Sequence, residues 1–199
     1  MAATPFRMVM APPGAGKSTF IQAHPELYLV DGDNVVREII DKSSGEPLCS
    51  AANMHYYANR AGWGFAKWHR VNFRALMKAQ KESSLGTIFN GFLVDTDVEK
   101  VKKGYETFFS ERAEEQCRVL DNTCKLMACE VAVVLPEEKE YISRGQNRKR
   151  RRVSEKYALE CMRCYEYLLE TYPSMTRYQR FEDIPEGRFI PRPPVINAE

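Results

Sequence analysis

Short apolar runs alternate along this chain with longer segments of helical periodicity, an alternation that is typical of an α/β fold. Four apolar runs are predicted to form strands: residues 5–11, 27–30, 86–90 and 129–135. Apolar residues at helical spacing predict helices between and after these strands, at residues 17–23, 35–40, 51–60, 63–82, 98–127 with an interruption near Gly104, 137–143 and 154–170. This order predicts a parallel sheet with right-handed crossovers, sandwiched by helices in three αβα layers.

The first apolar run leads into Ala-Pro-Pro-Gly-Ala-Gly-Lys-Ser-Thr at residues 11–19. This segment matches the phosphate-loop pattern Gly-x-x-x-x-Gly-Lys-Ser/Thr, except that Ala11 stands at the first glycine, where a small side chain is the main requirement. Backbone N–H groups and the helix N-terminus would bind phosphate there, and Lys17 would reach the β- and γ-phosphates. The predicted nucleotide-binding residues of the loop are Pro13, Gly14, Ala15, Gly16, Lys17, Ser18 and Thr19. The alternative is a glycine-rich turn, but the strand and helix on either side favour the phosphate loop.

Two aspartates follow the second predicted strand, in the sequence Asp31-Gly32-Asp33. Ligands of open parallel sheets bind at the carboxyl ends of the strands, so we expect both carboxylates to face the same crevice as the phosphate loop. Mg²⁺ would take an oxygen from Ser18, and one carboxylate could face the metal while the other faces an acceptor. A second magnesium contact stays open, because Asn90 ends the third strand. The alternative interpretation of the two aspartates is a turn-forming pair.

Charge is distributed unevenly along the 199 residues, whose formal net charge is only +2. Six of the 29 Lys and Arg residues lie within residues 144–152, a stretch without acids, and the rest of the chain is mildly acidic. This concentration predicts a local site for an anion, which could be a nucleotide, a polynucleotide or both. A solvated basic face, a nuclear-import-like signal and a non-catalytic nucleic-acid contact remain alternatives.

The six cysteines lack the spacing of a disulfide framework, so reduced thiols are expected. In Cys161-Met-Arg-Cys164 the predicted helix favours packing over metal ligation. The N-terminal residues do not resemble a secretory signal, and no apolar run has the length of a membrane span. We therefore expect a cytoplasmic protein without a membrane partner.

One domain is expected over residues 1–182. It would include a helical acceptor-side region at about 43–82, whose aromatic stripe is either core or acceptor contact, and a basic lid at about 137–156. The proline-rich residues 183–199 are expected to form an extended tail, either laid along the body or mobile.

The chain from about residue 6 to 169 resembles the phosphate-loop (P-loop) kinase superfamily, and two of its branches compete. Residues 28–37, Tyr-Leu-Val-Asp-Gly-Asp-Asn-Val-Val-Arg, look like the Asp-Gly-Asp-Asn-Val-Arg stretch of adenylylsulfate kinases, with one extra valine. The Phe-Thr-Gly motif of that family is absent. Residues 143–165 look like the lid of polynucleotide 5′-hydroxyl kinases, with Ser154 in place of a proline and an unusually long basic run.

The resemblance implies roles for several side chains. Asp33 would orient or deprotonate the acceptor hydroxyl, Arg37 would contact an acceptor phosphate, and Asp31 would join the magnesium shell. Three lid arginines are implied, at least one of which should touch the donor phosphates: Arg144, Arg148 and Arg152. The residues implied to act directly in catalysis are Lys17, Asp33 and Arg148.

These features predict a kinase of the P-loop fold that uses Mg²⁺ and transfers the γ-phosphoryl group of ATP or GTP to a hydroxyl. The favoured acceptor is the 5′-hydroxyl of a nucleic acid. A small-molecule kinase, acting on a nucleoside, nucleotide or adenylylsulfate, is the alternative among enzymes. A nucleic-acid-binding NTPase that uses hydrolysis as a switch is the alternative from another class.

Overall fold

A five-stranded sheet forms the centre of the computed structural model, which describes residues 3–32, 34–35, 77–78, 80–81, 85–91, 114, 117–147 and 154–194. All neighbouring strands are parallel, and their order is β2-β3-β1-β4-β5. Their bounds are β1 Met8–Met10, β2 Leu29–Asp31, β3 Thr87–Asn90, β4 Val131–Val134 and β5 Thr176–Tyr178. Strand β1 is therefore central, and the loop that follows it leaves the middle of the sheet.

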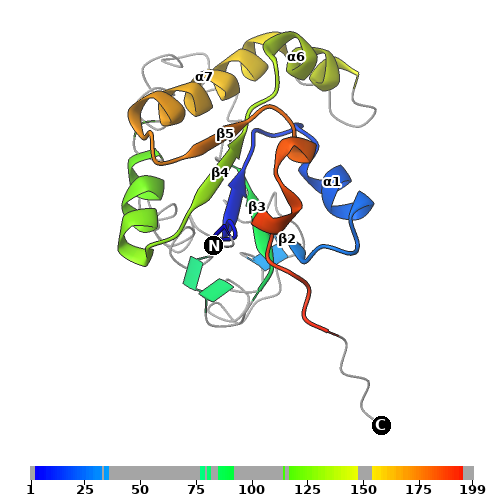
Figure 1. Ribbon diagram of the computed structural model, residues 1–199. Helices are drawn as coiled ribbons and strands as arrows, with labels where there is room; N and C mark the ends of the chain where they lie inside the picture. The colour runs from blue at the N-terminus through cyan, green and yellow to red at the C-terminus, as the bar shows by residue number, and fades with distance from the viewer. Residues whose placement is uncertain are drawn as a thin grey trace, which may run out of the picture.

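Both faces of the sheet are covered, because its strands alternate buried side chains between two apolar clusters. Met8 and Met10 of β1 belong to a cluster with the helix at residues 117–127 and with α7 (Glu155–Thr171), whereas Val9 belongs to a cluster with α1 (Lys17–Ala23). Figure 1 shows α1 on one side of the sheet and α7 on the other. The predicted three-layer αβα sandwich is confirmed.

The helices start where the local sequence predicts. Helix α7 is capped by Ser154, whose hydroxyl accepts a hydrogen bond of 3.2 Å from the backbone N–H of Tyr157, as predicted. Helix α6 (Glu138–Gln146) extends three residues beyond its predicted end and has Arg144 in its last turn, where the helix dipole favours a cation. None of the helices in the described part of the chain has the length and apolar character that a membrane crossing requires.

Strand β5 and two short 3₁₀ turns, Phe181–Asp183 and Glu186–Arg188, were not predicted. The proline-rich segment contacts the body as far as Arg192, whose Nη2 donates to the Leu27 carbonyl at 3.0 Å. Phe189 is buried, and the N–H of Ile190 donates to Thr87 Oγ1 at 2.9 Å. Apart from residues 77–78 and 80–81, the predicted acceptor-side region at 43–82 lies outside the described residues, as do residues 148–153 of the predicted lid.

The C-terminal segment contributes two rings to an aromatic cluster. Phe181 and Phe189 lie 5.3 and 5.9 Å, respectively, from Phe20 of α1, measured between ring centroids, and Phe181 also stacks on Phe89 of β3. All four rings are buried. Residues far apart in the sequence thus share one core, which joins the C-terminal segment to the sheet.

We predict that Phe189→Ala lowers the free energy of unfolding by about 3–5 kcal/mol, because it leaves a cavity among packed rings. Leu126→Ala is the matched control, since that leucine is 71% exposed, and it should change the value by less than about 0.5 kcal/mol. Urea unfolding followed by circular dichroism measures both. Equal effects of the two substitutions would contradict the docking of the C-terminal segment.

Candidate functional site

The loop between β1 and α1 has the backbone geometry of a phosphate loop. Gly14 and Gly16 have φ values of 92° and 105°, in the left-handed region that side chains disfavour. Gly16 is the N-cap residue of α1, and its carbonyl accepts the first helical hydrogen bond, from the N–H of Phe20 at 2.9 Å. The two glycines therefore let the chain turn sharply from a buried strand into a helix.

The Lys17 side chain lies against this loop. Its Nζ donates to the carbonyl oxygens of Ala11 and Pro12 at 2.7 and 3.1 Å. Gly91, just after β3, packs against the same part of the loop. A Cβ at this position would lie 2.9 Å from the Ala11 carbonyl oxygen and 3.3 Å from Lys17 Nζ. The end of β3 thus approaches the loop so closely that only glycine fits without a shift.

The neighbouring strand ends bring polar groups to the same edge of the sheet. Asp31, half-buried, ends β2 and lies in register with Phe89 of β3. A Cβ at Gly32 would lie 3.1 Å from Asn90 Cγ, so the chain after β2 touches the end of β3. Asp31 therefore lies at the carboxyl-end edge of the sheet, and only β3 separates its strand from β1, the strand that leads into the loop.

Helix α6 contacts the loop through two side chains. The Tyr141 hydroxyl donates to the Pro13 carbonyl at 2.7 Å, and Arg144 Nη1 donates to the Ala15 carbonyl at 3.1 Å. Because residues three apart share a helix face, both reach the loop from one side of α6. Arg144 Nη2 is also paired with Glu140 at 2.6 Å, which fixes the guanidinium above the loop. Tyr141 was not predicted as a site residue, although its position one turn before Arg144 was a usable signal.

A cavity of about 360 Å³ opens beside the loop. It is bounded by the loop and α1, the end of β4, Arg144, and the segment after β5. Its lining residues are Gly14, Ala15, Gly16, Thr19, Phe20, Ala23, Val134, Arg144, Gln179, Arg180, Phe181 and Glu182. The volume and the mixture of apolar and polar walls suit a small organic group such as a heterocyclic base.

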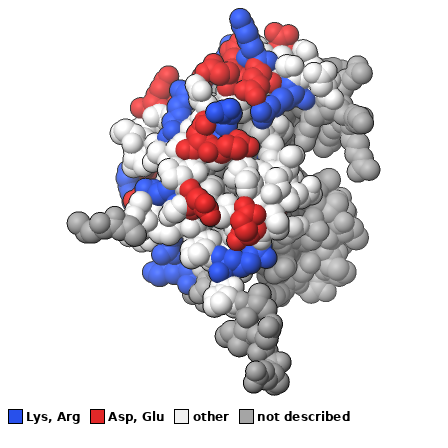
Figure 2. Space-filling view, turned by 45° about the vertical axis from the view of Figure 1, so that its right-hand side comes forward, with Lys and Arg blue, Asp and Glu red and all other residues white. Residues whose placement is uncertain are grey.

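Two polar side chains at the cavity rim are held in place by a hydrogen bond and an ion pair with neighbouring residues. Gln179 Nε2 donates to Glu137 at 2.6 Å, and Arg180 pairs with Asp183 at 3.1 Å. The hydrogen bond with Asp183 raises the pKa of Arg180, so that guanidinium remains charged. On the face drawn in Figure 2, acidic and basic side chains of the described residues are interspersed. The described ion pairs therefore give the rim a mixed charge.

Magnesium would find hard oxygen donors here. The Ser18 hydroxyl is exposed in the first turn of α1, and Asp31 offers a carboxylate at the same edge of the sheet. Mg²⁺ commonly binds one or two protein oxygens and completes its shell with phosphate and water. The donor types thus fit the metal, although no group of three or more His, Cys, Asp or Glu with metal-site geometry occurs in the described ranges.

The two cysteines of α7, Cys161 and Cys164, are buried core residues. Burial raises the pKa of Cys161 to about 12, and a hydrogen bond donated by the Cys164 thiol to Cys117, together with burial, raises that of Cys164. Both side chains are buried in the apolar cluster between α7 and the sheet. A metal-bound thiol must lose its proton, which these surroundings oppose.

Several predicted site residues are thus at or near the loop, and others are not described. Arg144 contacts the loop, and Lys17, Ser18 and Thr19 lie in it or directly after it. The positions of the remaining candidates lie outside the described residues: Asp33, Arg37, Arg148 and Arg152.

No protein-family model matches the chain, and no curated protein matches it. Among solved structures, a tunicamycin resistance protein from Deinococcus radiodurans is similar with a TM-score of 0.46 and 10% identity, over 94% of this chain and 91% of that one. A gluconokinase from Sinorhizobium meliloti 1021 is similar with a TM-score of 0.39 and 12% identity, over 87% of this chain and 81% of that one. These distant likenesses carry no argument about the reaction, which has to be inferred from the site itself.

We predict that Tyr141→Phe weakens nucleotide binding by about 5- to 10-fold, because it removes a loop hydrogen bond of about 1 kcal/mol. Tyr178→Phe is the control: it also removes a tyrosine hydroxyl, and its ring packs against Phe6 at the other end of β1. Calorimetric titration with ATP and Mg²⁺ measures the dissociation constants. Equal affinities of the two variants would contradict a positioning role for Tyr141.

Proposed function

We propose that the chain is a phosphotransferase that takes its phosphoryl group from a nucleoside triphosphate. The observation that carries this proposal is the loop itself: two glycines at positive φ, with Lys17 folded against the loop and Arg144 donating to it from α6. Such a loop presents backbone N–H groups and two cations to phosphate oxygens. A triphosphate is the ligand that best matches this arrangement.

The cavity beside the loop would take the nucleoside base. It shares Gly14, Ala15 and Gly16 with the loop, so a base there would remain within reach of its own phosphates. Phe181 offers a buried aromatic ring, and the planar guanidinium of Arg144 can stack on a heterocycle. Donor binding would then use the loop, α6 and the segment after β5 together.

Phosphoryl transfer depends on positioning and on the neutralisation of charge. Lys17 would exchange the carbonyls of Ala11 and Pro12 for the donor phosphates and hold the transferring group. Ser18 and Asp31 would hold Mg²⁺, which when bound offsets the charge of the phosphates. Asp33 would accept the proton of the attacking hydroxyl, and Arg148 and Arg152 would neutralise the phosphoryl group as it moves.

The acceptor that we favour is the 5′-hydroxyl of a nucleic acid, on the strength of the basic run. Of its six cations, Arg144 engages the proposed donor loop, and we propose that the other five bind the donor or a polymer. Arg37 would contact an acceptor phosphate. A small-molecule acceptor and a hydrolytic switch remain the alternatives. The labelling experiment with γ-labelled ATP and an oligonucleotide distinguishes the three possibilities.

We predict that Lys17→Ala lowers phosphoryl transfer at least about 100-fold, because it removes a cation from the transferring phosphate. Lys139→Ala on the exposed side of α6 is the matched control and should keep full activity. Transfer is measured with γ-labelled ATP, and folding with circular dichroism. A folded Lys17→Ala variant that keeps full transfer would exclude the loop as the donor site.

We predict that γ-labelled ATP labels the 5′-hydroxyl of an oligonucleotide. Replacing Arg150 and Arg151 by glutamine should raise the KM for the oligonucleotide more than the KM for ATP. Polymer binding releases counterions, so the oligonucleotide KM should also rise steeply with salt. Label in a nucleoside, nucleotide or adenylylsulfate alone would favour the small-molecule alternative. Release of phosphate without any labelled acceptor would favour the switch.

A further inference from the structure

The helix at residues 117–127 ends in a motif that brings two cysteines together. Ala128 has a φ of 47°, the N–H of Cys129 donates to the Cys124 carbonyl at 3.1 Å, and the N–H of Ala128 donates to the Lys125 carbonyl at 3.4 Å. These are the two hydrogen bonds of a Schellman motif, which commonly brings the side chains at the positions of Cys124 and Cys129 together. An apolar contact usually occupies this place, and here it is a pair of thiols.

The two sulfurs have different surroundings. Cys124 is buried, whereas Cys129 is half-buried, with its Sγ 3.9 Å from the Cys124 carbonyl oxygen and 3.6 Å from Met77 Sδ. A hydrogen bond donated by the Cys124 thiol lowers the pKa of Cys129, and the Arg7 guanidinium lowers it further. The same hydrogen bond, together with burial, raises the pKa of Cys124. Of the two thiols, Cys129 is therefore the one that loses its proton more readily.

We propose that Cys124 and Cys129 are a thiol pair that hydroperoxides oxidise to an intramolecular disulfide. With hydrogen peroxide, the Cys129 thiolate attacks one peroxide oxygen, an S–O bond forms, the O–O bond breaks, and the departing hydroxide takes up a proton. Cys124 then attacks the sulfur of the sulfenic acid: an S–S bond forms, the S–O bond breaks, and the leaving hydroxide takes the thiol proton. Two thiols and one peroxide thus give one disulfide and two waters.

The other described cysteines are poor competitors for the oxidant. Cys117 and Cys164 also approach each other, with Cys117 Sγ 3.7 Å from the Cys164 carbonyl oxygen, but both are buried between the helices. Burial keeps Cys161 protonated as well, with a pKa of about 12. Reactivity follows thiolate character and access, so Cys129 should react first.

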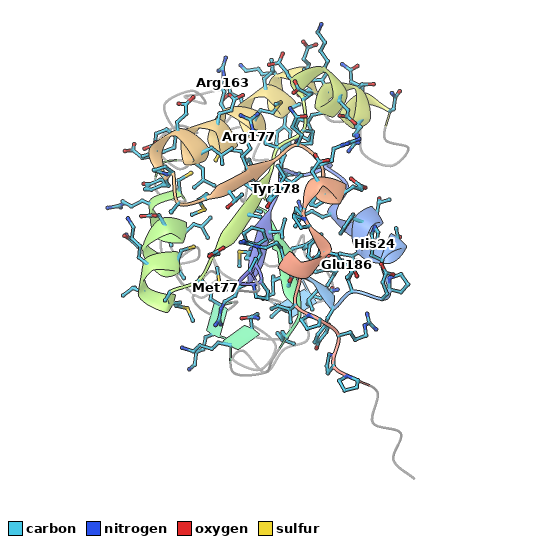
Figure 3. All side chains as sticks on the ribbon, viewed as in Figure 1. His24, Met77, Arg163, Arg177, Tyr178 and Glu186 are labelled. Atoms are coloured by element: carbon cyan, nitrogen blue, oxygen red, sulfur yellow. The ribbon has the colours of Figure 1, made fainter. Side chains whose placement is uncertain are left out.

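The pair is remote from the phosphate loop. Cys129 precedes β4, and in a parallel sheet the amino ends of the strands lie at the edge opposite to the loop. Figure 3 shows Met77, which touches Cys129, at the end of the molecule away from α6. The proposal does not depend on the proposed phosphotransferase function, and failure of either one leaves the other intact.

The test is a peptide map of the full chain after treatment with hydrogen peroxide. Trypsin cleaves after Lys125, between the two cysteines, so the disulfide joins the fragments 119–125 and 126–139. We expect this linked pair in non-reducing mass spectrometry and its disappearance on reduction. Fragments that stay separate, or a link from Cys129 to any other cysteine, would overturn the proposal.

Two variants sharpen the test. Cys124→Ser should leave a sulfenic acid on Cys129, which dimedone traps, whereas Cys161→Ser should still form the link and serves as the matched control. If Cys124→Ser fails to fold, the map of the unaltered chain decides alone. Iodoacetamide should modify Cys129 at least about tenfold faster than Cys161, because alkylation follows the thiolate. Equal rates would also overturn the proposal.

Discussion

Backbone hydrogen bonding in the loop after β1 is the constraint on which the rest of the site depends. A loop that turns its N–H groups toward phosphate must turn carbonyl oxygens elsewhere, and buried carbonyls need partners. Lys17 donates to the first two carbonyls, Tyr141 to that of Pro13, and Arg144 to that of Ala15. The glycines allow the backbone to adopt the loop conformation, and the hydrogen bonds from these three side chains stabilise it.

This requirement explains why α6 and the C-terminal segment belong to the site. Tyr141 is buried, and its contact with the loop fixes the position of α6. Arg144, one turn further along the same helix, therefore reaches the cavity. Phe181 lines the same cavity while stacking on Phe89 of the sheet core. The wall of the cavity and the apolar core are thus continuous, and a change in the packing of the C-terminal segment reaches the base-sized cavity directly.

Sequence patterns predicted what is local and missed what depends on tertiary contact. The loop, α1 and the Ser154 cap follow from a few neighbouring residues, so motif and periodicity were sufficient. Strand β5 has only three residues on an exposed edge, too few for a periodic signal. The Tyr141 contact joins residues 128 positions apart. The cysteine pair was hidden because Ala128 occupies a left-handed position where glycine is the usual signal.

The side chains around the loop also bear on the free-energy cost of binding. Lys17 already lies within the loop, so phosphate would replace two carbonyls as its partner while most of the side chain stays in place. Arg144 uses Nη1 and Nη2 for its present partners, and a guanidinium has five N–H donors, so it can bind a ligand without releasing the loop. Ordering one long side chain costs about 0.5–1.5 kcal/mol on binding, and here that cost has been met during folding. A site ordered in this way needs less of its interaction energy for its own arrangement, which would favour binding of the triphosphate that we propose as the donor.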